Sequence, residues 1–245
     1  GLDNLGLIAS SGGESACNVV VTAAPAGPTF ADAFSSYPLN SCFSDDATFG
    51  PWKSVFGGYG CTQVKSDGTK SWLEQAPMAS LTPADTHASL VTGPSFTAPY
   101  TFSVDMNTVS QLRKNDPPNA WETAWVGWNY TDAEHFYYFA LKPNGWELGK
   151  RDPAYTGGQR FLATGASPKL QLGAWDTVKV VQAAGSLSVY VNGQLVTTFA
   201  DAERPYASGA LTLYNEDAQV RFTNVSVVVG AEGSLTTDAR NGVWV

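Results

Sequence analysis

The chain has 245 residues, of which 15% are charged and 12% aromatic, and its formal net charge is −8. A charged fraction this far below the usual quarter is typical of an extracellular β protein with many turns rather than of a helical cytosolic enzyme. The acidic balance argues against a nucleic-acid-binding protein, which needs a basic face, and no apolar run is long enough to span a membrane. We therefore expect a secreted monomer with neither nucleic-acid nor membrane partners.

Residues 1–29 are rich in Gly, Ser and Ala and contain one apolar run, Val19–Val21. They predict an N-terminal arm or strand that packs on the body of the protein. For residues 30–245 we expect a single domain, because short alternating or apolar runs follow one another with no linker between them. The predicted strands are residues 63–65, 71–75, 88–91, 100–112, 121–130, 135–142, 146–151, 160–163, 175–183, 186–191, 194–199, 209–214 and 220–229.

The turns between these strands favour antiparallel pairing. Asn192-Gly193 lies between two strand patterns and is a strong hairpin signal, because a type I′ turn needs positive φ at both central positions. Asn144-Gly145 gives the same signal, and no segment has helical periodicity with caps. More than ten short strands in one domain predict an all-β protein, namely a β-jelly-roll sandwich of two antiparallel sheets with a concave groove.

The C-terminal strands carry a family resemblance. Gly173–Trp175 opens a strand, and Leu187–Val196, Gly209–Tyr214 and Val220–Val227 follow it in order. This run resembles the end of concanavalin A-like jelly rolls, including laminin-G-like domains and the 3-keto-disaccharide hydrolase group, and the resemblance covers roughly residues 30–229. It implies the fold but not the chemistry, because that superfamily contains lectins, hydrolases, lyases and structural modules.

Three cysteines are present: Cys17, Cys42 and Cys61. We predict a disulfide between Cys42 and Cys61, which flank a segment rich in glycine and aromatic residues, and this pairing leaves Cys17 over. The sequons at Asn129 and Asn224 matter only if the host glycosylates proteins. Together with the cysteines they support secretion.

The stretch from Trp121 to Asp152 is the densest in aromatic and polar residues, and we expect it to form the middle of the working face. Alternation sends Trp125 and Trp128 to opposite faces, and it separates Tyr137 from Tyr138 in the same way. Some of these rings must therefore fill the core, while others line the groove and stack on sugar rings. The predicted substrate-binding residues are Trp125, Trp128, Tyr138, Trp146, Lys150, Arg151 and Asn107.

The strand before this stretch has a polar face that contains Asp105, Asn107, Gln111 and Arg113. This face is either solvated or part of the same groove, and we favour the groove. Four cations, Lys142, Lys150, Arg151 and Arg160, follow within a short span of a chain that is acidic overall. Such a local excess of positive charge suits a polyanionic sugar.

Three functions fit these residues, and we favour the first, a secreted polysaccharide lyase that cleaves a uronate-containing glycan by β-elimination. It needs a group that neutralises the carboxylate, a base and an acid. We assign proton transfer to His135 or Tyr137 and carboxylate binding to Arg113, Gln111 and Lys142. The RxELR, QIH and YFKAGxY motifs of jelly-roll alginate lyases are absent, so the likeness to those lyases is one of residue types.

The second function is glycoside hydrolysis by a carboxylate pair, for which Glu122 and Glu147 are the candidates. The ExDxxE-type strand motif of laminarinase-like hydrolases is absent. The third is a non-catalytic carbohydrate-binding module, which needs only the aromatic platform. In all three the partner is a polysaccharide or oligosaccharide.

None of these chemistries requires a cofactor. Jelly rolls of the superfamily often hold a structural calcium ion between an early loop and a late strand, and the resemblance implies such a site here. Calcium prefers hard oxygen ligands, and Asp32 and Asp217 are the candidate ligands.

Overall fold

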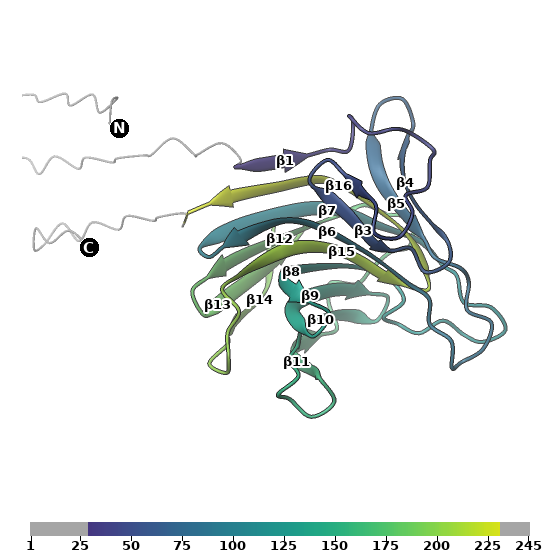
Figure 1. Ribbon diagram of the computed structural model, residues 1–245. Helices are drawn as coiled ribbons and strands as arrows, with labels where there is room; N and C mark the ends of the chain where they lie inside the picture. Colours follow the sequence, from purple (N-terminus) through teal and green to yellow (C-terminus); the bar gives the residue numbers. More distant parts are fainter. Residues whose placement is uncertain (1–28, 231–245) are drawn as a thin grey trace, which may run out of the picture. The chain divides into compact units, whose positions relative to one another are not determined.

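The computed structural model describes residues 29–230, which fold into sixteen β-strands and no helix (Figure 1). The described residues belong to one compact unit. The predicted N-terminal arm of residues 1–29 lies, apart from its last residue, outside the described part, as does Cys17. No helix among the described residues is long and apolar enough to cross a membrane.

The strands form two sheets of eight, and every pairing between named strands is antiparallel. The first, which we call the β7 sheet, contains in spatial order β14 (Gln194–Ala200), β13 (Ser186–Val191), β12 (Asp176–Ala183), β7 (Tyr100–Gln111), β16 (Ala218–Val229), β5 (Ser71–Ala76) and β4 (Cys61–Ser66), with β1 (Phe30–Asp32) paired to β16. The second, the β8 sheet, contains β11 (Gln159–Gly165), β10 (Gly145–Arg151), β9 (His135–Lys142), β8 (Ala124–Asp132), β15 (Ser208–Glu216), β6 (Ala88–Thr97), β3 (Trp52–Phe56) and β2 (Thr48–Phe49).

Strand positions follow the sequence pattern closely in the C-terminal half. Asn192 and Gly193 both have positive φ, at 50° and 80°, and they connect β13 to β14 as the hairpin signal predicts. The short strands β1, β2 and β3 were not predicted, because runs of two to five residues interrupted by Gly and Pro carry little alternation.

The hydrophobic core lies between the two sheets. Phe102, Val104 and Met106 of β7 enter it from one side, and Val126 and Trp128 of β8 enter it from the other. A second, smaller apolar cluster contains Trp125, Tyr138 and Ala140, with Phe136 and Tyr214 packed against it. Because neighbours along a strand point to opposite faces, this second cluster lies on the face of the β8 sheet turned away from the core.

The disulfide between Cys42 and Cys61 is present, which confirms the predicted pairing. It joins the start of β4 to the loop that precedes β2.

One prediction about the groove is wrong. The polar face of residues 101–113 was expected to line the same groove as β8, β9 and β10, but β7 lies in the other sheet, between β12 and β16. Its polar side chains turn away from the core, where Asp105 accepts hydrogen bonds from Thr177 and Asn224. The chain crosses between sheets after β7, so only the apolar faces of β7 and β8 meet.

Candidate functional site

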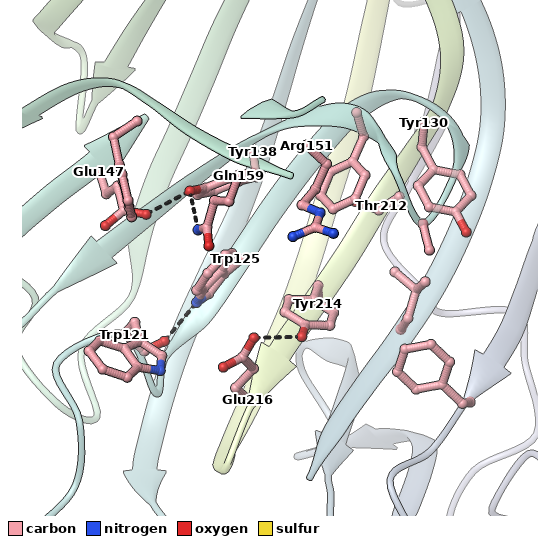
Figure 2. A pocket seen from close by; sticks show the side chains of 15 residues that line it. Trp121, Trp125, Tyr130, Tyr138, Glu147, Arg151, Gln159, Thr212, Tyr214 and Glu216 are labelled. Carbon is pink, nitrogen blue, oxygen red and sulfur yellow. Dashed lines mark hydrogen bonds between the residues drawn. The ribbon is translucent and has the colours of Figure 1, made fainter. Parts of the chain in front are cut away.

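The outer face of the β8 sheet is hollowed into a pocket of about 500 Å³. Side chains from β11 at one end to β3 at the other line this hollow (Figure 2). A pocket of this size fits the range of small-molecule sites.

The register of the sheet explains the shape of the hollow. One row of side chains crosses the sheet at right angles to the strands and contains, in order, Glu147, Ala140, Trp125, Tyr214, Leu90 and Phe56. Ala140 sits in this row between two large residues and leaves space above the sheet. In the neighbouring row Gly149 and Gly127 flank Tyr138. A Cβ on Gly149 would lie 2.1 Å from the Tyr138 ring, so this close approach requires glycine.

Aromatic rings form the floor and the rim. Trp125 stacks on Tyr138 with 4.8 Å between ring centroids and meets Tyr214 edge to face at 5.5 Å. The Trp125 indole donates a hydrogen bond of 2.7 Å to the carbonyl of Trp121. Trp121 is 44% exposed at the rim, and Phe161 of β11 is 60% exposed. Such amphipathic rings suit the flat C–H faces of a sugar.

Glu147 of β10 provides one carboxylate of the hollow. It accepts hydrogen bonds from the Tyr138 hydroxyl at 2.7 Å and from the Lys142 ammonium at 2.8 Å. The Tyr138 hydroxyl in turn accepts a hydrogen bond from Gln159 at 2.7 Å (Figure 2). Burial raises the pKa of Tyr138, and the charge of Glu147 raises it further. Tyr138 therefore keeps its proton and donates a hydrogen bond to Glu147.

Glu216 at the end of β15 provides the second carboxyl group. It accepts a hydrogen bond of 2.7 Å from the Tyr214 hydroxyl (Figure 2). Burial raises the pKa of Glu216, and the nearby charges of Asp217, Glu122 and Glu147 add to the effect, against the opposing hydrogen bond from Tyr214. A carboxyl group with a raised pKa is typical of a general acid.

Sequence reasoning missed Glu216, because the predicted strand 209–214 ends two residues before it. The alternation of β15 contains the missing signal. Leu211 and Leu213 point into the core, so Thr212, Tyr214 and Glu216 point outward to the hollow. Extending the predicted strand 209–214 by two residues places Glu216 on that face.

Four of the predicted site residues line the hollow: Glu147, Trp125, Tyr138 and Arg151. The guanidinium of Arg151 is paired with Glu134 at 2.7 Å. Their part in any reaction stays a prediction. The structure brings them together because they lie on adjacent strands with side chains on the same face.

Three predicted aromatic residues point the other way, into the core. Trp128 donates a hydrogen bond to Gln182, Tyr137 donates one to Asp201, and Trp146 donates one to the carbonyl of Ser167. Tyr137 and Trp128 are among the largest fully buried side chains. None of the three lines the hollow, since alternation places them on the opposite face from Tyr138 and Trp125.

Lys150, predicted to bind an anionic sugar, is fully buried. Its ammonium donates hydrogen bonds to Asp201 at 2.6 Å and to the carbonyls of Glu203 and Arg204. These acceptors use all three of its protons, so Lys150 connects β10 to the loop after β14 instead of facing a substrate.

Arg113 and Glu122 form a buried ion pair of 2.6 Å, and Arg113 also contacts Asp217 at 2.9 Å. The hydrogen bond to Glu122 raises the pKa of Arg113. Glu122 and Glu147 therefore do not face each other across the hollow, because the Glu122 carboxylate is buried in its ion pair with Arg113. The carboxyl group that shares the hollow with Glu147 is that of Glu216.

The remaining predicted polar residues also lie elsewhere. Gln111 donates to the carbonyl of Asn119, and Asn107 donates to the carbonyl of Gly173. His135 lies at the turn between β8 and β9, where its ring contacts Asp132 at 2.7 Å and packs edge-on against Tyr206. Lys142 reaches the hollow indirectly, as the partner of Glu147.

The two predicted calcium ligands do not share a site. Asp32 accepts hydrogen bonds from Tyr37, Trp52 and the backbone of Phe34. Asp217 directly precedes β16, whereas Asp32 of β1 pairs with Val225, toward the far end of β16. Asp217 and Val225 are eight residues apart along an extended chain, which is roughly 27 Å. No cluster of three or more His, Cys, Asp or Glu within residues 29–230 is arranged to hold a metal ion.

Two antiparallel sheets that enclose one core, with a hollowed outer face, define a concanavalin A-like jelly roll, as the resemblance implied. Residues 43–228 match the 3-keto-alpha-glucoside-1,2-lyase-like domain. The chain belongs to this family and is a carbohydrate-active jelly-roll domain.

Solved structures support the fold. A carbohydrate-binding module, CBM66, from Bacillus subtilis is similar with a TM-score of 0.51 at 15% identity over 72% of this chain and 94% of that one. A Bacillus subtilis protein of unknown function with a galectin-like fold gives a TM-score of 0.55 at 11% identity over 82% and 96%. At these identities the likeness concerns the fold alone. No curated protein matches the sequence.

Proposed function

We propose that the hollow of the β8 sheet binds a glycoside and cleaves its glycosidic bond by β-elimination. One observation carries the proposal: a carboxyl group with a raised pKa, Glu216, shares an aromatic hollow with a second carboxylate, Glu147. The family supports elimination over other reactions, because its description names a 1,2-lyase of 3-keto-α-glucosides.

Elimination from a 3-keto-α-glucoside needs one base and one acid. A carbonyl at C3 acidifies the hydrogen on C2. The base takes this proton, the C2–H electron pair forms the C1=C2 double bond, and the C1–O bond breaks. The leaving oxygen keeps the electron pair of that bond and takes a proton from the acid. The products are a sugar enone and a free alcohol, and neither water nor an oxidant is consumed.

We assign the base to Glu147 and the acid to Glu216. Between β10 and β15 lie two strands, so the two backbones are about 14 Å apart. Both side chains turn toward the space above Ala140 and Trp125, where a sugar ring stacks on the indole. Tyr138 and Lys142 fix the orientation of Glu147. The raised pKa of Glu216 favours its protonated form, which is the form that can protonate the leaving group.

The charge of the hollow favours a neutral sugar over the uronate polymer expected from the sequence. Glu147 and Glu216 are acidic, and the one cation on its wall, Arg151, is paired with Glu134. Arg113 and Lys150 are committed to buried carboxylates. A uronate would meet two carboxyl groups with no free cation among these residues. A 3-keto sugar needs no such cation, because its own carbonyl acidifies the hydrogen on C2.

Turnover of methyl 3-keto-α-glucoside by the full chain tests the proposal. We expect a rise in near-ultraviolet absorbance from the conjugated enone, with the C1=C2 product identified by NMR. Glu216→Gln and Glu147→Gln should each lower kcat about 10²- to 10⁴-fold. The matched control is Glu203→Gln, which alters an exposed carboxylate paired with Arg160 outside the hollow and should leave kcat unchanged.

The pH profile adds a second readout. The activity of the native chain should fall as pH rises through the raised pKa of Glu216, since the acid loses its proton. Release of reducing sugar from unoxidised glycosides, without an enone, would replace elimination by hydrolysis. Saturable glycoside binding with no turnover of either substrate would leave a carbohydrate-binding module.

We also propose that the domain works outside the cytoplasm. The disulfide between Cys42 and Cys61 supports this location, because such bonds persist in oxidising compartments. Thiol trapping of the protein from its native cells should find both cysteines oxidised. Free thiols at both positions would contradict the proposal.

A further inference from the structure

The two ends of the hollow differ in chemistry. Over β10 and β11 it is lined by Glu147, Arg151 and Gln159, which carry charges and an amide, and by the exposed ring of Phe161. Past Tyr214, the same row of side chains continues with Leu90 of β6 and Phe56 of β3. Figure 2 shows Glu147, Gln159 and Tyr138 on one side of the hollow, with Thr212 and Tyr130 on the other.

The side chains over β6 and β3, Leu90 and Phe56, are apolar. The cation on the wall of the hollow is Arg151, which pairs in register with Phe136 and whose guanidinium is held by Glu134. Leu90 is 7% exposed, and Tyr130 packs against Phe136 with 5.7 Å between ring centroids. Ala133 closes this end from the turn between β8 and β9. A second sugar ring would bring several hydroxyl groups against these side chains, and burying a hydroxyl without a hydrogen-bond partner is unfavourable. A flat apolar group gains from the same contacts.

Glu216 lies at the boundary between the two ends. Its strand, β15, is the neighbour of β6, and Glu216 pairs in register with Ala88. With Glu216 as the proton donor, a sugar above Ala140 and Trp125 has its anomeric bond toward Glu216, and its aglycone then lies toward Leu90 and Phe56. This places the proposed proton donor beside the leaving oxygen.

From this arrangement we infer that the substrates are glycosides with an apolar, aromatic aglycone, which occupies the end of the hollow formed by Phe56, Leu90, Tyr130 and Phe136. The inference rests on the proposed function for the reaction itself. The binding preference it predicts does not require turnover.

Binding to the full chain tests the inference directly. Titrations would compare p-nitrophenyl α-glucoside, methyl α-glucoside and maltose, none of which carries a keto group. We expect the aryl glucoside to bind roughly 10- to 100-fold more tightly than the other two, the gain expected from burying one aromatic ring. Turnover of the 3-keto forms of the same compounds should follow the same order in kcat/KM.

Two variants locate the preference. Phe56→Ala should reduce the ratio of aryl to methyl affinity about tenfold, whereas Phe161→Ala, the matched change at the polar end on β11, should leave the ratio unchanged. Ala133→Glu keeps the test valid if Phe56→Ala fails to fold, because Ala133 is an exposed turn residue. It brings a carboxylate to the apolar end and should also lower the ratio.

Equal or tighter binding of maltose would overturn the inference, as would a Phe56→Ala variant that weakens the methyl and aryl glucosides equally. A failure of the proposed function gives a different result. In that case no 3-keto glucoside is eliminated, while the affinity ratio of the unoxidised glucosides still reports whether the apolar end binds an aglycone.

Discussion

Replacing Lys150 by Met separates a structural role of this residue from a role in substrate binding. Both the Lys150 and the Asp201 side chains are 0% exposed, and their charged atoms are 2.6 Å apart. The variant leaves Asp201 with hydrogen bonds from Tyr137 and from the backbone of Glu203, and it removes the donor to the partly buried carbonyls of Glu203 and Arg204. Removing one partner of a buried ion pair costs about 3–5 kcal/mol, and Arg160, whose guanidinium lies 3.6 Å from Asp201, places the expected loss toward the lower end of this range.

Domains of this size shift in Tm by about 2–4 °C per kcal/mol, so Lys150→Met should lower Tm by about 6–20 °C. Thermal and urea unfolding measure this loss directly. The double variant Lys150→Met/Asp201→Asn has no buried charge at either position. It should lose less free energy of unfolding than the two single variants together, by a coupling free energy of about 0.5–3 kcal/mol. The control is Lys53→Met, which breaks an exposed pair with Asp46 and should cost at most about 1 kcal/mol.

Substrate affinity decides between the two roles. At a temperature where the Lys150→Met variant is folded, glucoside affinity should equal that of the native chain, because Lys150 does not line the hollow. The reasoning fails if Lys150→Met keeps its Tm and instead weakens binding of an anionic sugar, as the sequence-based assignment requires.

Three further outcomes follow from the described contacts. Burial alone would raise the pKa of Asp201, but hydrogen bonds from the Lys150 ammonium and the Tyr137 hydroxyl outweigh burial and lower this pKa. The stabilisation by the Asp201 carboxylate is therefore fully present above the ordinary aspartate pKa of about 4 and is lost as pH falls through the lower pKa of the folded protein. Urea unfolding at pH 7 and pH 3 should show a lower free energy of unfolding at pH 3. In a glycosylating host Asn224 should carry glycan and Asn129 should not, because Asn224 is exposed and Asn129 is fully buried; mass spectrometry of glycosidase-treated protein would refute this by finding the reverse. Gly149→Ala should abolish glucoside binding, since its Cβ displaces the Tyr138 ring; unchanged affinity in titration would contradict the account of the floor.

Local patterns in the sequence predict much of this fold, because strand alternation and turn chemistry are local properties. Asn192-Gly193 forms its hairpin, and alternation correctly sends Trp125 and Trp128 to opposite faces. Alternation does not tell which sheet a strand joins. Residues 101–113 were assigned to the wrong groove for that reason, since the partners of β7 are β12 and β16, both distant in sequence.

The candidate site was predicted only in part. The errors involve the core-facing aromatic residues Trp128, Tyr137 and Trp146 as well as several ionisable residues. A sequence shows that Lys150 and Arg113 are cations, but not that buried carboxylates from distant segments hold them. Glu147 was found because it lies in an aromatic strand with a clear alternating pattern. Glu216 was missed because its strand ends in acidic residues, which are also typical of a turn.

The adjacent residues Glu216 and Asp217 show how one turn serves two purposes. Strand alternation points Glu216 into the hollow, while Asp217, with a φ of 42°, turns inward and accepts hydrogen bonds from Arg113 and Ser80. The charge of Asp217 is thereby held next to Glu216, where it helps burial to raise the pKa of Glu216. The ion pairs of Arg113 with Glu122 and Asp217 also hold the crossing from β15 in one sheet to β16 in the other. The same contacts therefore position Glu216, the proposed acid.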